Sequence, residues 1–509
     1  MEGNPRIDSR VRCAATACPR TSRPHPRPLP TRSPSVSPHA PSVVSRARLL
    51  LVGLFALAGL AFASWLARIP TVRDLLDLST ADLGLLLLVG SVGSLLTVTT
   101  AGALVQRLGS RRVLLVSTLV LATALVLLGV GPTVGSRALL AAGIFLNGVA
   151  VALGNVAINV ESARIERALG RTVIPQFHAA FSIGAVVGSG AGAVASAAGV
   201  PVGVQLPLTA VVVVVWRLAS LRGVVLPAPV VAAAARAAAP PVAAPPVSRA
   251  RRGARRLATA LDAWREPRTL LVGVVVLSAA FSEGAANNWL SLAVVDGFAR
   301  SESVGGAVLG LFVASMTVVR LLGTRLIDRY GRVAVLRASG GASVVGLLLF
   351  GFAPSLALAC AGVVLWGAGA ALAVPVGIAA ASDDPVRAAG RVAVVSAFAS
   401  VASLVAPPVL GLAAQSVGAR QALVLIVAAM VASVVVAPAV APQTSDVPAP
   451  GGAGPATPGD GPPRLGGDPV ASADLDHLVR ARRHLPSVRA VRLRRRPRAG
   501  RPGARGGAR

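Results

Sequence analysis

Two ionisable side chains inside long apolar segments are the best candidates for chemistry in this sequence: Glu283 and His178. A charged group inside a membrane costs about 2.5–3.5 kcal/mol even on insertion scales, so its retention indicates a function or a specific hydrogen bond. We predict that Glu283 carries a proton, because burial favours the neutral form of a carboxyl group. The alternative is a structural Glu283 that hydrogen-bonds to Asn287 or Ser282 and fixes its helix.

His178 is the second candidate for proton coupling, and it is the only one of five histidines outside the two ends of the chain. Imidazole titrates near neutral pH, which suits proton exchange. A neutral histidine that donates one structural hydrogen bond explains the residue equally well. Arg320, in a later apolar segment, either counters the charge of Glu283 or extends to the nearer membrane surface.

Amide and aromatic side chains in the apolar segments are the candidates for solute binding. Asn155 and Asn159 are one helical turn apart and therefore share a helix face. Trp65 and Phe281 could also stack on a ligand, although interfacial anchoring explains Trp65 as well. The residues that we predict to line a substrate cavity are Asn155, Asn159, Phe177, Phe181, Asn287, Asn288 and Trp289.

The composition indicates a membrane protein. Of 509 residues, 54% are hydrophobic and only 14% are charged, whereas about a quarter of the residues of a soluble protein are charged. A water-soluble enzyme is therefore excluded, and the apolar segments contain no recognisable catalytic motif. The three cysteines (Cys13, Cys18 and Cys360) cannot form a disulfide framework or a four-ligand zinc site, so we expect no metal and no cofactor.

The elements that must position these residues are apolar runs of about 20 residues, the length at which a helix crosses ~30 Å of hydrocarbon. The sequence predicts an all-α integral membrane protein with about twelve transmembrane helices. Their expected ranges are 48–67, 82–105, 113–131, 137–159, 175–198, 202–220, 269–292, 304–325, 333–353, 355–380, 392–415 and 420–441.

Composition also divides the chain into five parts. We predict a disordered basic N-terminal tail (1–46), an N-terminal six-helix bundle (47–222), a cytoplasmic linker (223–268), a C-terminal six-helix bundle (269–441) and a disordered basic C-terminal tail (442–509). The tails and linker are rich in Arg, Pro and Gly and lack a hydrophobic period, so they cannot bury enough apolar area to fold.

Arginine in short loops favours the cytoplasmic side of a membrane. The net charge is +30, and every basic residue is arginine. Most loop arginines fall on one side of the alternating spans, which predicts a plasma (inner) membrane protein with both termini in the cytoplasm. The basic tails would then contact anionic lipid headgroups, whereas specific nucleic-acid binding is not expected because the tails lack aromatic residues.

An A-x-A site at Ala61–Ala63 allows a cleaved signal peptide in place of the first membrane span, but cleavage would spoil the charge alternation.

Two short loops at the same place in each six-helix half share a pattern of glycine and arginine. Glycine permits a tight turn, and arginine holds a loop at the cytoplasmic face. The residues of the first loop are Gly102, Arg107, Gly109, Arg111 and Arg112, and those of the second are Asp328, Arg329, Gly331 and Arg332.

With these loops the sequence resembles the major facilitator superfamily over about residues 48–441. The resemblance implies two six-helix bundles around a central cavity. Gln106 replaces the aspartate usual in the family's first loop, which puts the latch between the halves in doubt there, whereas Asp328 can retain it in the second. More local motifs look like a bacterial branch allied to the fucose permeases: Ser64–Pro70, Asn155–Asn159, Phe177–Gly184 and Glu283–Trp289. Relatives often have Asp at the positions of Asn155 and Asn288.

The resemblance implies a secondary active transporter that moves a small polar solute, such as a sugar, by alternating access, with a proton as the coupling ion. Its partners are the solute, protons and the lipid bilayer, and the oligomeric state is open. The alternatives are an efflux antiporter for drugs or metabolites and a transport-inactive membrane sensor. Gly184, Gly188 and Gly192 recur every four residues, so we expect them to let a neighbouring helix pack closely.

Overall fold

The computed structural model describes residues 40–171, 173–227, 230, 262–384 and 387–442. These residues form helices and contain no strand. The elements are α1 (Ala40–Leu66), α2 (Ile69–Leu75), α3 (Thr80–Leu108), α4 (Ser110–Thr133), α5 (Arg137–Leu169), α6 (Ile174–Ala197), α7 (Val202–Val224), α10 (Pro267–Phe298), α11 (Glu302–Tyr330), α12 (Arg332–Phe352), α13 (Leu356–Ala370), α14 (Ala373–Ala381), α15 (Ala388–Val417), α16 (Ala419–Ala422), η1 (Leu423–Leu425), α17 (Ile426–Val436) and η2 (Ala437–Val440).

Twelve segments of the described chain are long and apolar enough to cross a membrane, and they coincide with the twelve predicted spans. The all-α membrane fold predicted from the sequence is thus confirmed. Most of both predicted tails and of the predicted linker lies outside the described residues. Several helix boundaries differ from the predicted ranges; α1, for example, begins at Ala40, inside the predicted N-terminal tail. The buried side chains of Val44 and Ala47 pack in the hydrophobic core of the first six spans and extend the helix there.

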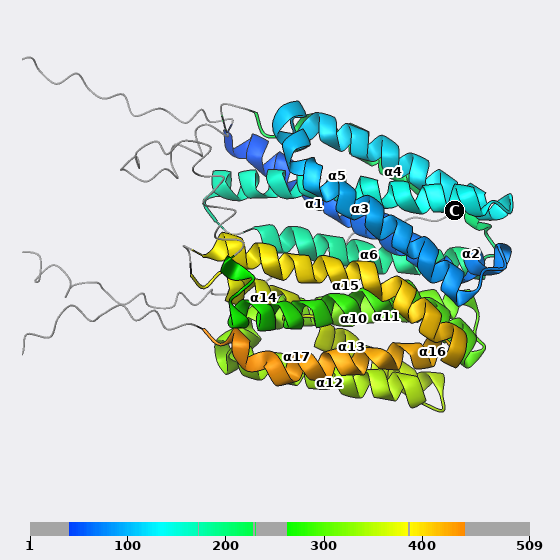
Figure 1. Ribbon diagram of the computed structural model, residues 1–509. Coiled ribbons are helices and arrows are strands. Elements are labelled where there is room, and N and C mark those ends of the chain that lie inside the picture. Colours follow the sequence, from blue (N-terminus) through cyan, green and yellow to red (C-terminus); the bar gives the residue numbers. More distant parts are fainter. Residues whose placement is uncertain (1–39, 172, 228–229, 231–261, 385–386, 443–509) are drawn as a thin grey trace, which may run out of the picture. The chain divides into compact units, whose positions relative to one another are not determined.

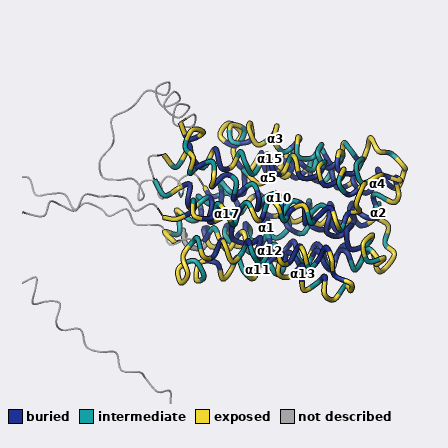
Figure 2. The backbone as a smooth tube through the Cα atoms, turned by 60° about the horizontal axis from the view of Figure 1, so that its bottom comes forward, coloured by how far each residue is buried: buried dark blue, intermediate teal, exposed yellow. Residues whose placement is uncertain are grey.

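The helices run side by side along a common direction, and buried residues concentrate where they contact one another (Figure 2). Large apolar side chains are exposed on the outer faces, for example Leu208 at 61% and Leu321 at 63%. Lipid tails can cover such faces, and the backbone polar groups are satisfied inside each helix. In Figure 1, α2 and α16 lie at one end of the helices and α14 at the other.

Glycines form the contact between α1 and α6. A Cβ atom added to Gly184 would lie 1.8 Å from the Ala56 carbonyl oxygen, and one added to Gly188 would lie 2.2 Å from that of Leu60. These distances confirm that the four-residue glycine spacing serves close helix packing, because any side chain at these positions would clash with backbone atoms.

The two glycine–arginine turns have nearly the same backbone conformation. Gly109 joins α3 to α4 with φ 82° and ψ 151°, and Gly331 joins α11 to α12 with φ 77° and ψ 160°. Glycine is favoured at such positive φ values, which explains the shared residue in both halves. We call the end of the helices that carries these two turns the arginine end, and the other the far end.

The tenth span is bent between α13 and α14. Pro375 lies inside α14 and has no N–H, so it cannot donate the helical hydrogen bond to the carbonyl of Ala371, four residues earlier. Ala371 and Leu372 join the two helices at this point. The Ala371 carbonyl therefore needs another donor, which Arg320 of α11 supplies.

Candidate functional site

A cavity of about 590 Å³ lies between the first six and the last six spans. Its wall comes from α1, α3 and α5 of the first half and from α10, α14 and α15 of the second. Ligand-binding cavities in proteins commonly have volumes of about 300–1,000 Å³, so a small solute fits here. The lining includes three amides, four hydroxyls and two aromatic rings: Asn147, Asn287, Asn288, Ser91, Ser94, Ser400, Ser403, Phe62 and Trp65.

Glu283 is the one charged side chain among the residues that line this cavity. It lies about 24 Å from the start of α10 at 1.5 Å per residue, near the middle of the helix. Arg320 on α11 donates to its carboxylate, with 2.9 Å between Nη2 of Arg320 and Oε2 of Glu283. The side chains of Arg320 and Glu283 are 32% and 28% exposed, so solvent reaches both members of the pair.

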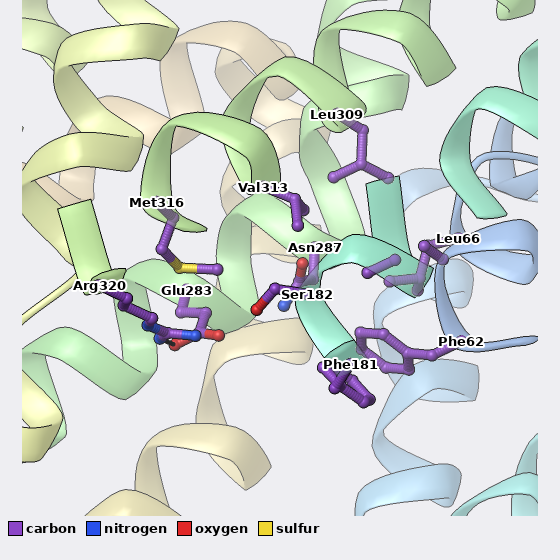
Figure 3. A pocket seen from close by; sticks show the side chains of 12 residues that line it. Phe62, Leu66, Phe181, Ser182, Glu283, Asn287, Leu309, Val313, Met316 and Arg320 are labelled. Carbon is purple, nitrogen blue, oxygen red and sulfur yellow. Dashed lines mark hydrogen bonds and ion pairs between the residues drawn. The ribbon is translucent and has the colours of Figure 1, made fainter. Parts of the chain in front are cut away.

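A smaller cavity of about 30 Å³ adjoins the same pair (Figure 3). Glu283, Arg320, Asn287 and Ser182 supply its polar groups, and Phe62 and Phe181 lie at one side of it. This volume is enough to hold a water molecule, which needs about 10–15 Å³ on the same measure, and the four polar side chains offer it hydrogen bonds. The sequence-predicted residues Glu283, Asn287 and Phe181 thus lie together, and Asn288 lines the adjoining larger cavity.

Other predicted residues lie outside both cavities. Phe177 is fully buried and stacks on Phe55, with 5.5 Å between ring centroids. Trp289 is 1% exposed, with its indole nitrogen buried. Both rings fill the space between helices. His178 packs edge-on against Phe55, and the charge of Arg320 lies within electrostatic range of it.

Asn155 and Asn159 hydrogen-bond to each other on α5. The side-chain nitrogen of Asn159 donates to the carbonyl and to the side-chain oxygen of Asn155, both at 2.8 Å. Asn147, Val151, Asn155 and Asn159 follow one another at intervals of four residues and therefore share one face of α5. Asn147 and Val151 line the cavity, and the other two continue this face toward the arginine end. That spacing could have identified Asn147 from the sequence. The serines gave no comparable signal, because serine is common in membrane helices.

The loop residues lie at the arginine end, away from both cavities. Gly109, Arg111, Arg112 and the neighbouring Arg107 are exposed, and Gly102 is half-buried. In the second loop, Asp328 and Arg329 are exposed and Gly331 forms the turn. Arg332 pairs with Asp383 at 2.7 Å inside the same half. Asp328 forms no ion pair with any other described residue, and its role as a latch between the halves stays a prediction.

Two ion pairs join the halves at the far end instead. The Arg68 Nε lies 3.2 Å from Oε2 of Glu302, and the two side chains are 4% and 9% exposed. Arg73 pairs with Asp296 beside them. The backbone N–H of Thr71 donates to the other Glu302 oxygen at 2.9 Å. The first half supplies both cations and the second half both anions.

Close backbone packing accompanies these pairs. A Cβ atom on Gly84 of α3 would lie 2.6 Å from the Pro407 carbonyl oxygen of α15, and the Ser189 hydroxyl of α6 donates to the Gly306 carbonyl of α11 at 2.6 Å. Between described residues, no ion pair joins the halves at the arginine end. Ion pairs and close backbone packing thus join the two halves at the far end.

A charged cluster at the arginine end surrounds the start of α10 in the second half. Arg391 donates to both oxygens of Glu266, at 2.7 and 2.5 Å, and Thr269 donates to the same carboxylate at 2.7 Å. Burial by itself would raise the pKa of the Glu266 carboxyl, but the hydrogen bonds from Thr269 and Arg391 outweigh it and hold that pKa below its usual value. The cluster fixes the start of α10 against α15.

The sequence matches the family model described as the Major Facilitator Superfamily over residues 13–165 and 272–498. Among curated proteins, it is 31% identical over 369 residues to "Uncharacterized transporter y4wD" of Sinorhizobium fredii (strain NBRC 101917 / NGR234), which covers 72% of this chain and 90% of the relative. It is 28% identical over 376 residues to "Membrane protein MosC" of Rhizobium meliloti, covering 74% and 85%.

Solved structures show the same fold at low sequence identity. The nucleoside transporter NupG aligns with a TM-score of 0.59 and 17% identity, covering 77% of this chain and 98% of that one. The transporter FucP in its outward conformation aligns with a TM-score of 0.52 and 15% identity, covering 78% and 99%. At these identities the likeness shows the arrangement of helices and leaves the solute open.

Proposed function

The chain belongs to the major facilitator superfamily, and from that premise we propose that it is a proton-coupled secondary transporter of a small, polar, uncharged solute. The observation that carries the proposal is a cavity of about 590 Å³ between the two halves, with a carboxylate at mid-membrane depth in its wall. A site of this kind between two rocking halves suits alternating access.

The lining supports a neutral solute rich in hydroxyl groups. Three amides offer both donors and acceptors. The hydroxyls of Ser91, Ser400 and Ser403 donate to backbone carbonyls and keep their oxygens as acceptors. The Phe62 and Trp65 rings can stack on the apolar face of a sugar. Glu283 is already paired with Arg320, so the wall offers no unpaired charge to an ionic solute. One solved relative, FucP, is described as a fucose:proton symporter, which agrees with a sugar-like solute.

Glu283 is the group best placed to exchange a proton. Its pairing with Arg320 stabilises the charged carboxylate, whereas its depth in the membrane favours the neutral form. The partial exposure of both side chains gives protons a route through solvent. His178, on the other half and within electrostatic range of Arg320, is the second candidate.

The loop arginines support a plasma (inner) membrane protein whose arginine end and termini face the cytoplasm. With that orientation, the far end is the outer one, and its two ion pairs keep the cavity closed to the outside. The state described here then corresponds to the inward-facing step of the cycle. The basic tails would lie near anionic headgroups of the inner leaflet.

The test is a search for the solute followed by transport. Purified protein is screened against sugars, polyols and nucleosides for thermal stabilisation, because a ligand that binds only the native state raises its apparent stability. The hit is then offered to proteoliposomes with an imposed pH gradient. Accumulation with proton entry supports symport, exchange of solute for protons supports the efflux alternative, and binding without accumulation supports the sensor.

A further inference from the structure

The contacts of Arg320 reach beyond Glu283 to the bend in the tenth span. Its Nε donates to the carbonyl of Ala371 at 3.2 Å, and its Nη2 donates to Glu283 at 2.9 Å. Ala371 is the residue whose carbonyl loses its helical donor because Pro375 lacks an N–H. One guanidinium therefore satisfies both the carbonyl freed by the proline and the carboxylate of the cavity.

Ser282, the residue before Glu283, is hydrogen-bonded to α13, the helix on the other side of the bend. The indole nitrogen of Trp366, near the end of α13, donates to the Ser282 hydroxyl at 2.7 Å, and both side chains are buried. This contact is between neutral groups and does not depend on pH. Two consecutive residues of α10 thus contact the tenth span. Ser282 binds Trp366 of α13 directly, and Glu283 reaches the Ala371 carbonyl at the bend through Arg320.

The charge of Glu283 decides how firmly Arg320 is held. A hydrogen bond between two charged groups is roughly twice as strong as one between neutral groups. When Glu283 takes up a proton, Arg320 loses its strongest partner, and the donor to Ala371 is no longer fixed in place. Ala371 lies at the junction between α13 and α14, and α14 lines the cavity through Val374.

We propose that Arg320 is a positioning residue that couples the protonation of Glu283 to the bend between α13 and α14. The inference rests on the proposed proton-coupled transport and adds the part of the chain that responds to the proton. The charged or titratable groups that face Glu283 from the packed elements are Arg320 on α11 and, across the halves, His178 on α6. The other cavity-lining residues of the described chain carry no charge.

The test measures the bend directly. Spin labels are placed at the exposed position Leu358 on α13 and at Ala379 on α14 after the three native cysteines are replaced. An unbent helix would separate these positions by about 31 Å, and a change of bend alters that distance. The distance is measured in the reconstituted full-length protein at about pH 5 and about pH 8, on either side of neutrality.

In the otherwise unaltered protein we expect the label distance to differ between the two pH values. Arg320→Gln and Glu283→Gln should each abolish the difference. Arg337→Gln, an exposed arginine on α12 of the same half, is the matched control and should keep it. An unchanged distance in the unaltered protein, or a preserved difference in Arg320→Gln, would overturn the inference.

Pro375→Ala tests the same link with Arg320 and Glu283 intact. The alanine N–H can donate to Ala371, so the carbonyl no longer needs Arg320. We expect a label distance that no longer responds to pH; a preserved response would overturn the inference even if Arg320→Gln does not fold. Proton-driven uptake is measured in parallel. Uptake together with a pH-insensitive bend contradicts this inference alone, whereas no proton-driven uptake contradicts the proposed function.

Discussion

At the scale of single residues, the candidate site combines one ion pair with neutral amides and hydroxyls. Glu283 and Asn287 are one turn apart on α10, so the same helix face presents the carboxylate and an amide to the cavities. A solute bound there would contact Asn287 without disturbing the Glu283–Arg320 pair. Binding and proton exchange can therefore be separated by substitution.

The first prediction concerns solute affinity. Replacing Asn287 by Ala removes an amide from the cavity wall, and the loss of one hydrogen bond costs about 1 kcal/mol, or roughly a fivefold rise in Kd. Asn159→Ala is the control, because Asn159 hydrogen-bonds to Asn155 outside the cavities. The Kd for the solute found in the screen is measured by titration calorimetry. Equal Kd values for the two variants would show that Asn287 does not bind the solute.

At the scale of helices, the sequence predicts the elements better than it predicts the contacts between their side chains. The apolar runs predicted twelve spans because a membrane requires a fixed length of apolar helix, and the glycine spacing at Gly184 and Gly188 predicted a close helix contact. The sequence left open whether Arg320 counters Glu283 or extends to the membrane surface, because that contact depends on how α10 and α11 pack. Trp289, which the sequence predicts to line the cavity, is 1% exposed, and a single helix pattern does not tell a cavity-facing ring from one in a contact between helices.

A second prediction follows from the α1–α6 contact. Gly184→Ala places a methyl group where the Ala56 carbonyl oxygen lies, so the helices must separate. Overpacking of this kind costs about 1–3 kcal/mol, and the thermal midpoint of the purified protein should fall. Gly190→Ala is the control, because nothing lies within 4 Å of its added methyl group. If both variants unfold at the same temperature, the contact is looser than described.

A third prediction concerns the Glu266–Arg391 pair at the start of α10. The Glu266 carboxyl has a pKa below its unfolded value, so the stability that it contributes is present above the unfolded pKa and is lost as pH falls through the folded one. Thermal unfolding between about pH 3 and about pH 6 should therefore show a steeper loss in the unaltered protein than in Glu266→Gln. Parallel curves for the two proteins would contradict the assignment.

At the scale of the whole molecule, the two halves contact each other most firmly at the far end. The buried Arg68–Glu302 pair and the Arg73–Asp296 pair must separate when the cavity opens there. Removing one partner of a buried ion pair leaves an uncompensated charge, which costs about 3–5 kcal/mol in the closed state. Such a loss favours the state in which the halves have separated and water reaches the remaining charge.

The fourth prediction is therefore that Glu302→Gln shifts the protein toward an open far end. A single cysteine at Ser189, which lies buried against Gly306, should react faster with a membrane-impermeant thiol reagent added from outside. Asp77→Asn is the control, because Asp77 is an exposed carboxylate at the same end that forms no ion pair with a described residue. Equal reaction rates in the two backgrounds would show that the pair does not hold the halves together.

The central claim is that Glu283 carries the proton that drives solute across the membrane, and proton flux on solute addition tests it most directly. Proteoliposomes with a pH-sensitive dye inside receive the solute identified by the screen. We predict that solute acidifies the lumen of vesicles with the unaltered protein, and that vesicles with Glu283→Gln bind the solute without any change of internal pH. Acidification at the same rate with Glu283→Gln would contradict the account.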